Sequence, residues 1–268
     1  MKLLITGGAG FIRSNFVQYV LASHADWQVV VLDKLTYAGN LRNLTGAMED
    51  PRLRFIRLDI CEASPLEPTS PYAASKAASD VLILSAVKTY RFPAIITRCT
   101  NNYGPFQFPE KFIPLMISQA FAGQYLPVYG DGKNVRDWIH VADHCLALDL
   151  IFRTGKNGEI YNIGGGNELE NIVVARKILQ LLGRPESLLK FVVDRPGHDR
   201  RYALDCTKLK NSLGWEPRWK FEKGLTDTIR WYQENSDWLA ETLSREYKNY
   251  FDRHYTRRDP TFATFVKS

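Results

Sequence analysis

A glycine-rich turn near the amino terminus constrains the fold of this chain more than any other feature. Residues 2–6, Lys-Leu-Leu-Ile-Thr, form a short apolar run that stops at Gly7 and Gly8. From Phe11 to Leu21 the apolar residues recur at helical spacing, and residues 27–33 form a second apolar run rich in β-branched residues. A buried strand, a glycine turn, a helix and a second buried strand, in this order, open a doubly wound α/β fold with a parallel sheet.

The rest of the chain continues this alternation and then becomes mostly helical. Leu53 to Leu58 forms a third apolar run, which ends at Asp59. Further strands are predicted at 93–98 and 159–163, and further helices at 70–90, 109–121, 137–152, 171–182, 207–213 and from 221 onward. The predicted fold is therefore α/β, a doubly wound parallel sheet with a smaller carboxyl-terminal α/β domain that binds the substrate.

Composition and charge argue against several other classes of protein. With 45% hydrophobic and 24% charged residues the chain is typical of globular proteins. No apolar run reaches the roughly 20 residues that span a bilayer, and the amino terminus turns glycine-rich too early for a signal peptide. The net charge of +6 is interspersed apart from a basic tail after Ser244, which disfavours nucleic-acid binding. The four cysteines are far apart, as in reduced cytosolic proteins, so neither a disulfide framework nor a zinc site is predicted.

The glycine turn has the residues of a dinucleotide-binding site. Gly7 and Gly10 permit the tight turn and let phosphate groups approach backbone N–H groups at the positive end of the helix. Asp33 ends the second strand, 23 residues after Gly10. A carboxylate there accepts hydrogen bonds from an adenosine ribose and repels a 2′-phosphate. The predicted cofactor is therefore NAD rather than NADP.

Arg13 departs from the usual glycine pattern. A third glycine normally stands at this position, because it lets the helix pack closely on the strand. An arginine must either extend outward or crowd the cofactor. The affinity for NAD is thus open at this position, while the predicted fold is unchanged.

Tyr72 and Lys76 lie four residues apart in a predicted helix, and therefore on one helical face. A nearby ammonium group lowers the pKa of a tyrosine, so that the phenolate can accept a proton from a substrate hydroxyl. The same lysine can hold the nicotinamide ribose. A solvated helix face would explain the spacing by itself, but after an NAD-type turn a catalytic pair is favoured.

Several longer motifs together resemble the extended short-chain dehydrogenase/reductases, and among them the dTDP-glucose 4,6-dehydratases. The matching segments cover nearly the whole chain to about Trp238 and are residues 7–12, 33–40, 70–76, 101–105, 108–111, 129–132, 134–138 and 194–199. This resemblance implies a Rossmann-like NAD-binding domain at 1–103 plus 134–166. A nucleotide-sugar domain would occupy 104–133 plus 167–268.

The resemblance also implies the residues of both sites. Tyr72 and Lys76 would be catalytic. The cofactor would meet Gly7, Gly10, Phe11, Ile12, Asp33, Lys34, Leu35, Thr36, Asp59, Ile60, Tyr72, Lys76 and Asn102. The nucleotide sugar would meet Asn101, Lys111, Phe112, Pro127, Val128, Tyr129, Arg136, Asn171, Arg195 and His198. A cytoplasmic homodimer that serves deoxysugar and polysaccharide synthesis is implied, with no metal, membrane or nucleic-acid partner.

In this family the reaction is an internal redox step with loss of water. Tyr72 would take the proton of the sugar 4-hydroxyl while hydride moves from C4 to NAD. The 4-keto group then acidifies the proton at C5, which a glutamate removes, while an aspartate protonates the departing 6-hydroxyl and the hydride returns to C6. The family carries the two carboxyl groups as Thr-Asp-Glu, shortly before the tyrosine helix.

This chain has no Thr-Asp-Glu triplet. The nearest acids precede the third strand or lie in a proline-rich connector. Only twelve residues separate Asp59 from Tyr72, too few for a strand and a crossover helix. Both observations indicate that a block of about 65 residues is missing near Cys61-Glu62.

Two explanations of this gap compete. The block is part of the molecule but absent from the printed sequence, or it is deleted and leaves a crippled binding module. We favour the first, because a sheet without two central strands would expose unpaired edges. A Cα separation at Cys61–Glu62 well above the roughly 3.8 Å of a peptide bond would confirm it.

The sequence leaves other functions open. A UDP-sugar epimerase or decarboxylase needs no elimination pair, and a non-catalytic NAD- or nucleotide-sugar-binding paralogue would tolerate both Arg13 and the missing block. His140 and His144 lie four residues apart on a predicted helix, as zinc ligands can, but a third ligand is lacking. Metal binding is therefore disfavoured.

Overall fold

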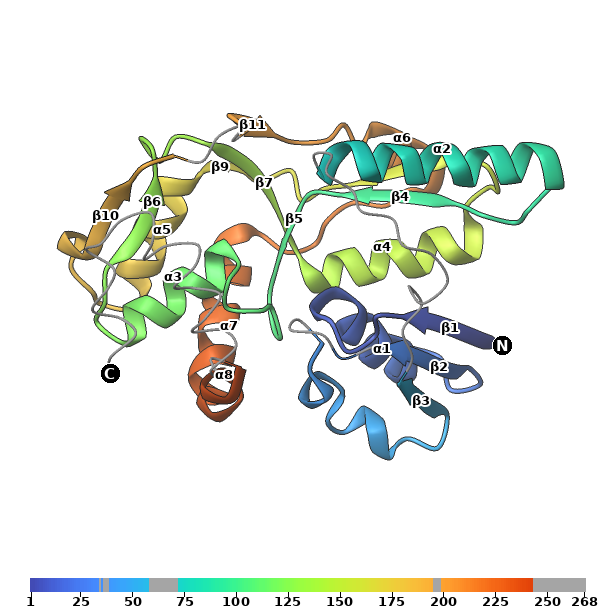
Figure 1. The fold of residues 1–268 in the computed structure, drawn as a ribbon, viewed down its shortest axis with the longest axis horizontal. Coiled ribbons are helices and arrows are strands. Elements are labelled where there is room, and N and C mark those ends of the chain that lie inside the picture. Colours follow the sequence, from blue (N-terminus) through green and yellow to red (C-terminus); the bar gives the residue numbers. More distant parts are fainter. Residues whose placement is uncertain (34, 36–38, 58–71, 195–198, 243–268) are drawn as a thin grey trace.

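The amino-terminal part of the chain forms a parallel sheet of order β1-β2-β3 (Figure 1). The computed structural model describes residues 1–33, 35, 39–57, 72–194 and 199–242, and of residues 72–78 it describes only the helical backbone. The three strands are β1 (Lys2–Thr6), β2 (Gln28–Asp33) and β3 (Leu53–Arg57), and α1 (Phe11–Ser23) connects the first two. The strand, turn, helix and strand predicted from the sequence are confirmed. Two short 3₁₀ turns, Leu41–Leu44 and Ala47–Glu49, precede β3.

Strand β1 lies at the edge of this sheet. It pairs with β2 alone among the described strands, and the side chain of Leu4 is 60% exposed. On the other face Ile5 packs with Val29 and Val31 in the amino-terminal core. The prediction that this strand is buried is therefore wrong for the face that carries Leu4, and in the described part of the chain nothing pairs with the second edge of β1.

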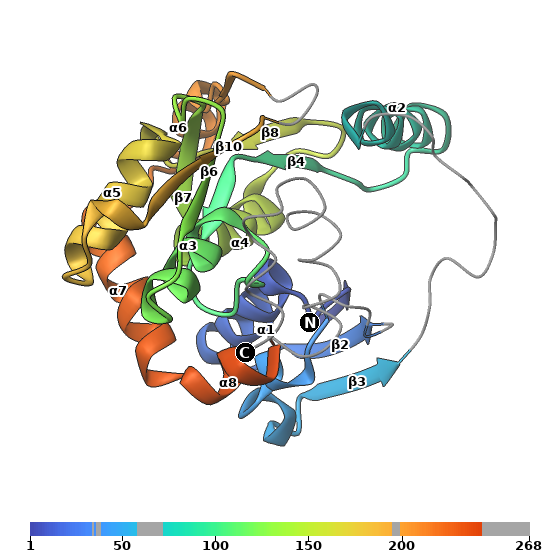
Figure 2. The ribbon, with the colours of Figure 1, turned by 60° about the vertical axis from the view of Figure 1, so that its left-hand side comes forward.

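A separate pair of parallel strands carries the next part of the fold. Strand β4 (Ile96–Cys99) pairs with β8 (Ile160–Ile163), next to the helices α2 (Tyr72–Tyr90) and α4 (Val141–Thr154) (Figures 1 and 2). Helix α4 also packs against α1. The parallel sheet is thus divided in two among the described residues, as expected if strands between β1 and β4 are missing. The Cys61–Glu62 junction itself lies outside the described residues.

The remaining strands form the other end of the molecule. Strand β7 (Val135–His140) is central, with β5 (Asn101–Tyr103) on one side and β11 (Arg201–Tyr202) and β9 (Glu168–Glu170) also paired to it, while β6 (Leu126–Tyr129) pairs with β10 (Leu189–Val192). The helices here are α3 (Phe112–Phe121), α5 (Asn171–Leu181), α7 (Phe221–Glu234) and α8 (Ser236–Thr242), with a 3₁₀ turn at Glu186–Leu188, while α6 (Thr207–Leu213) packs against β8 and α4. Between α3, α5 and α7 lies the largest core cluster, which includes Ile117, Ile178 and Leu225.

The helix predicted at 137–152 is wrong in its first four residues. Residues Val135–His140 are the strand β7, and the helix α4 begins only at Val141. The Nδ1 atom of His140 accepts a hydrogen bond from the backbone N–H of Ala142 at 3.3 Å, so this histidine caps the helix. His140 and His144 are therefore not two residues of one helix, as a zinc pair would require.

Two sets of hydrogen bonds connect the carboxyl-terminal helices to the rest of the fold. The side chain of Asn43 donates to the carbonyl of Ala9 at 2.8 Å and accepts from Nε1 of Trp238 in α8 at 2.8 Å. In the second set, the Tyr232 hydroxyl in α7 donates to the carbonyl of Gln107 at 2.5 Å. Residues far apart in the sequence thus hold the glycine turn and the segment after β5 in place.

None of the helices in the described part of the chain is long and apolar enough to cross a membrane. Cys99, Cys145 and Cys206 carry free thiols, and Cys61 lies outside the described residues. The domain boundaries predicted from the sequence stay a prediction.

Candidate cofactor and substrate site

The turn between β1 and α1 is built to receive phosphate. Gly7 has a φ of +64°, in the left-handed region that favours glycine, and its carbonyl accepts the N–H of Gly10 at 3.1 Å. Gly10 is the residue before α1, so Phe11 and Ile12 form the first turn, where backbone N–H groups lack intrahelical partners. That turn has neither a capping side chain nor an acidic residue. The positive end of the helix therefore faces no protein anion of its own first turn.

Asp33 lies at the end of β2, directly beside this turn. Its side chain is buried, and its two carboxylate oxygens accept the N–H groups of Ala9 at 2.8 Å and Leu35 at 2.7 Å. Leu35 adopts a φ of +58° and packs on the amino-terminal core. Each oxygen retains a lone pair, so the carboxylate can still accept a ribose hydroxyl. The turn and the acid thus fit the adenosine half of a dinucleotide.

Arg13 is exposed and lies across the glycine turn. A Cβ atom placed on Gly7 would lie 2.3 Å from Nη1 of Arg13, so the guanidinium rests against the backbone of the turn. The side chain reaches out of the helix, but its end returns to the place where phosphate groups would approach. Arg13 therefore extends outward and also crowds the turn, so each of the two alternatives predicted from the sequence is correct in part.

We expect Arg13→Gly to tighten NAD binding about threefold or more, because the guanidinium no longer occupies the turn. Isothermal titration of the purified protein with NAD measures this. Arg13→Lys is the matched control, since it keeps the charge but lacks the planar fork. Unchanged affinity in the glycine variant would reject crowding, and weaker binding would mean that Arg13 itself holds the diphosphate.

Several predicted residues cannot be placed at side-chain level. Tyr72 and Lys76 lie in the first turns of α2, where only the backbone is described. Lys34, Thr36, Asp59, Ile60, Arg195 and His198 all lie outside the described residues. The sites predicted for them stay predictions.

The described substrate residues gather around β7. Asn101 and Asn102 in β5 pair in register with Trp138 and Ile139 of β7. Phe112, the first residue of α3, stacks on Trp138 with the ring centroids 6.0 Å apart and the planes at 28°. Asn171 donates its backbone N–H to Asn134, the residue before β7, at 3.0 Å. The fold thus brings Asn101, Phe112 and Asn171, which are distant in the sequence, to one strand.

Arg136 is a buried arginine on β7. Its Nη1 donates to the carbonyl of Val135 at 2.7 Å and its Nη2 donates to the carbonyl of Asp199 at 2.8 Å. The exposed fraction of the residue is 7%. The guanidinium is therefore held by its own strand and by Asp199, the last residue of the matching segment 194–199.

The predicted base-flanking segment forms strand β6. Pro127 and Val128 are buried and Tyr129 is half-buried. Val128 belongs to the large core cluster, so only its backbone can face a ligand. Tyr129 is the last residue of the strand, before Gly130.

Two further residues of this region have structural roles that the sequence does not indicate. Glu110 is buried and pairs with Nζ of Lys111 at 2.6 Å, while its Oε2 has no hydrogen-bond partner among the described residues. His144 donates or accepts a hydrogen bond through Nδ1 at 2.8 Å from Oδ1 of Asn102. In the sequence, Glu110 stands out only as part of the matching segment 108–111, and His144 only as a candidate metal ligand. In the described part of the chain no cluster of three potential metal ligands occurs.

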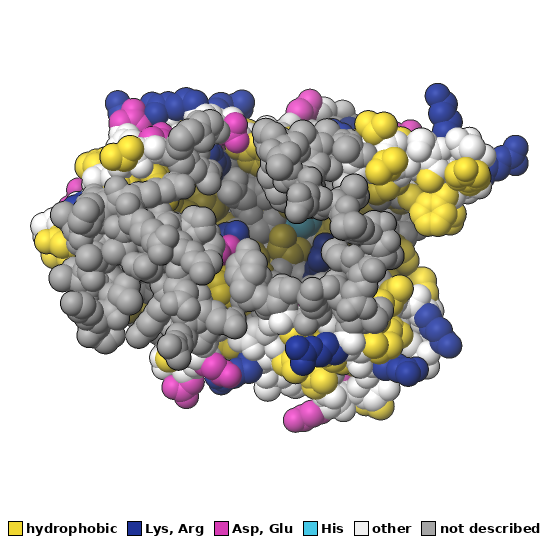
Figure 3. All heavy atoms as spheres, viewed as in Figure 1, with side chains coloured by type: hydrophobic (Ala, Val, Ile, Leu, Met, Phe, Trp, Pro, Cys, Tyr) yellow, Lys and Arg dark blue, Asp and Glu magenta, His cyan; other side chains and the backbone are white. Residues whose placement is uncertain are grey.

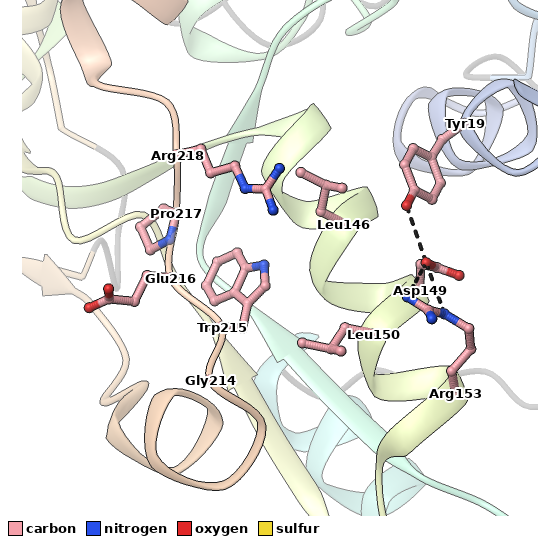
Figure 4. A pocket seen from close by; sticks show the side chains of 10 residues that line it. All are labelled: Tyr19, Leu146, Asp149, Leu150, Arg153, Gly214, Trp215, Glu216, Pro217 and Arg218. Carbon is pink, nitrogen blue, oxygen red and sulfur yellow. Dashed lines mark hydrogen bonds and ion pairs between the residues drawn. The ribbon is translucent and has the colours of Figure 1, made fainter. Parts of the chain in front are cut away.

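A cavity of about 440 Å³ lies elsewhere, between α1, α4 and the loop before α7 (Figure 4). Its wall includes Trp215, Arg218 and the buried Asp149, which accepts hydrogen bonds from Tyr19 at 3.2 Å and from Arg153. None of its lining residues is a predicted site residue. The cavity therefore shares no lining residue with the candidate site.

The turn, the buried acid and the strand β7 define a class of dinucleotide-binding α/β proteins, and comparisons with known proteins agree. Residues 3–67 match the NAD dependent epimerase/dehydratase family and residues 61–228 match the GDP-mannose 4,6 dehydratase family. A dTDP-glucose 4,6-dehydratase of Actinoplanes sp. is 39% identical and aligns with 89% of this chain and 99% of its own length. The chain belongs to the dTDP-glucose 4,6-dehydratase family.

Solved structures agree with this assignment. The dTDP-glucose 4,6-dehydratase of Bacillus anthracis, solved in complex with NAD, is 38% identical, with a TM-score of 0.84 over 90% of this chain and 99% of that chain. A UDP-glucuronic acid 4-epimerase of Bacillus cereus has a TM-score of 0.79 over 87% of this chain and 99% of that chain, but only 21% identity. The epimerase therefore shares the fold alone.

The alignment with the Actinoplanes relative also bears on the missing block. It runs over 318 positions, whereas 89% of this 268-residue chain is about 239 residues, which leaves roughly 80 positions that the chain does not fill. The two family matches meet at residues 61–67. The relatives thus have more residues than this chain, by an amount close to the block predicted near Cys61-Glu62.

Proposed function

We propose that this protein is an NAD-dependent dTDP-glucose 4,6-dehydratase, which converts dTDP-glucose to dTDP-4-keto-6-deoxyglucose with loss of water. The observation that supports NAD as the cofactor is the buried Asp33, which lies beside a helix terminus whose first turn has no acidic residue. Relatives of 37–39% identity that are named for this activity support the substrate. The product would serve deoxysugar and polysaccharide synthesis in the cytoplasm.

The chain's own residues divide this work between two regions. The first-turn N–H groups of α1 would bind the diphosphate of NAD, and Asp33 would bind the adenosine ribose. Asn101, Lys111 and Arg136 would orient the sugar nucleotide along β7, where Arg136 is held in place by two carbonyls. Tyr72 would hold and move the proton of the sugar 4-hydroxyl, and Lys76 would stabilise its phenolate. Bound NAD would supply a reversible hydride acceptor.

A second candidate is a binding protein that holds NAD and a nucleotide sugar without elimination. The observation that favours it is specific: the sequence has no Thr-Asp-Glu triplet, and roughly 80 aligned positions of a relative are unfilled. Elimination needs two carboxyl groups of different protonation state, which those positions would provide. The two candidates therefore share every binding residue and differ in product formation.

Incubation with dTDP-glucose separates the two candidates. A dehydratase forms the 4-keto-6-deoxy product, which mass spectrometry detects as a loss of water, and we expect Tyr72→Phe to lower the rate about 10²–10⁴-fold while NAD still binds. Ser75→Ala, a neighbouring change in the same helix, is the matched control. Binding of NAD and dTDP-glucose by the wild type without any product would favour the second candidate, and UDP-glucose as a parallel substrate tests the base.

We also propose that the protein forms a homodimer through α2. Val81 and Leu82 on this helix are 64% and 69% exposed, and Tyr90 at its end is 80% exposed. Hydrophobic side chains gather at this corner of the molecule (Figure 3). Apolar area of this kind is typical of a face that a partner covers. Sedimentation of the wild type against Leu82→Glu tests this assembly.

A further inference from the structure

Asn102 is a predicted cofactor residue whose backbone is fixed independently of its side chain. It lies in β5, paired with Ile139 of β7, and is 7% exposed. Its carbonyl accepts a hydrogen bond from Nε2 of Gln107 at 2.8 Å, and the carbonyl of Gln107 in turn accepts from the Tyr232 hydroxyl. A change in the environment of the Asn102 amide therefore leaves the strand position in place.

The orientation of the Asn102 amide follows from its two neighbours. Nδ2 lies 3.1 Å from the carbonyl of Thr100, which can only accept, so this atom must be the amide nitrogen. Oδ1 then faces Nδ1 of His144 at 2.8 Å and needs a donor. A neutral imidazole has one N–H, so the proton of His144 must be on Nδ1.

The environment of His144 keeps it in this neutral form. The residue is 4% exposed on α4, and burial lowers the pKa of His144 to about 4. Near neutral pH the ring is uncharged and donates a single hydrogen bond to Asn102. One N–H of the amide is then bonded to Thr100, and the other is left to point elsewhere.

Other polar atoms around Asn102 lack partners in the protein. Oγ1 of Thr100 and Oε1 of Gln107 are both buried and have no hydrogen-bond partner within the described ranges. Thr100 and Gln107 are the residues bonded to the side-chain N–H and to the carbonyl of Asn102, so both of these hydrogen-bond partners carry an unsatisfied polar atom of their own.

We infer that His144 is a positioning residue for the cofactor: its Nδ1–H fixes the Asn102 amide so that the remaining N–H meets bound NAD. This inference rests on the proposed function, because it takes NAD as the ligand. Asn102 touches the cofactor, whereas His144 acts only through Asn102. The hydrogen bond from Nδ1 of His144 to Oδ1 of Asn102, and not the volume of the imidazole ring, is what supports NAD binding.

Paired variants separate the bond from the volume. His144→Asn retains a donor near the Nδ1 position, while His144→Leu fills a similar space without one. We expect His144→Leu to weaken NAD binding about tenfold, the cost of one buried hydrogen bond, and His144→Asn to stay within about threefold of the wild type. Titration calorimetry measures the binding, and urea unfolding measures the stability of each variant. Equal weakening in both variants would overturn the inference and leave His144 a packing residue.

A double-mutant cycle tests that His144 acts through Asn102. If it does, His144→Leu costs no further affinity in the Asn102→Ala background, whereas additive losses overturn the inference. Failure of the proposed function is distinguishable, because the wild type would then form no product from dTDP-glucose, while a cofactor site that is wrongly assigned would leave it unable to bind NAD. In that case the side-chain amide signals of Asn102 in a ¹⁵N spectrum, identified by their loss in Asn102→Ala, supply the readout. They should shift more in His144→Leu than in His144→Asn, and a shift in His144→Leu that is equal or smaller contradicts the bond.

Discussion

We expect Gly165→Ala to destabilise the protein by about 3 kcal/mol or more, the upper end for overpacking a closed core. A Cβ atom on Gly165 would lie 2.0 Å from the carbonyl oxygen of Trp138 and 2.9 Å from Cα of Ile139. Both are backbone atoms of β7, which cannot yield as a side-chain end can. Since Trp138 and Ile139 pair with Asn101 and Asn102, the displacement would reach the candidate site.

The neighbouring glycine supplies the control for this prediction. Gly166 has a φ of +64°, and nothing lies within 4 Å of the place where its Cβ would stand. Gly166→Ala should therefore cost only the backbone strain of about 1 kcal/mol. Urea unfolding followed by tryptophan fluorescence measures both variants. Similar losses at the two positions would show that β7 can move to admit a methyl group.

The second large effect is a loss of stability in mild acid. Burial lowers the pKa of both His140 and His144 to about 4. For His140 the nearby Asp227 opposes this effect only in part. In the unfolded chain both rings titrate near the ordinary value of about 6.5, so between these values the unfolded state binds more protons and stability falls as pH falls.

This linkage predicts a loss of about 2 kcal/mol for each histidine between pH 8 and pH 5. Carboxyl groups whose pKa is lowered by an ion pair, such as Glu159 beside Lys208, titrate below this window. His144→Asn removes one of the two groups and should remove about half of the pH dependence. Unfolding free energies of wild type and variant at both pH values measure it. An unchanged pH dependence in the variant would mean that His144 is not the titrating group.

The local part of the fold could be predicted because its signals are local. The sequence from Lys2 to Asp33 has the strand, turn and helix periods in order, and the structure places each element within a residue or two. Strand β7 was missed because Arg136, Asp137 and His140 are all buried, the first two bonded to other segments and the third to the start of α4. Polar residues on both faces hide the alternation of a strand, and the apolar pattern of α4 follows without a break.

The candidate site could be predicted only where a residue's role depends on its own motif. Asp33 and Gly7 have roles set within their own strand–turn–helix unit. The role of His144 depends on Asn102, 42 positions away, and on the orientation that Thr100 imposes. No sequence spacing encodes such a relation. The same limit applies to Leu4, whose exposure depends on elements outside its own strand.

The side chain of Asn43 has a consequence for how the protein is made. It joins the glycine turn, through Ala9, to Trp238 near the end of the described chain. A ribosome synthesises Ala9 and Asn43 long before Trp238. The hydrogen bond from Trp238 to Asn43 is therefore absent throughout most of translation. A nascent chain arrested before α8 would therefore have the whole glycine motif and yet hold dinucleotide poorly, and competence should arrive only with the last helices.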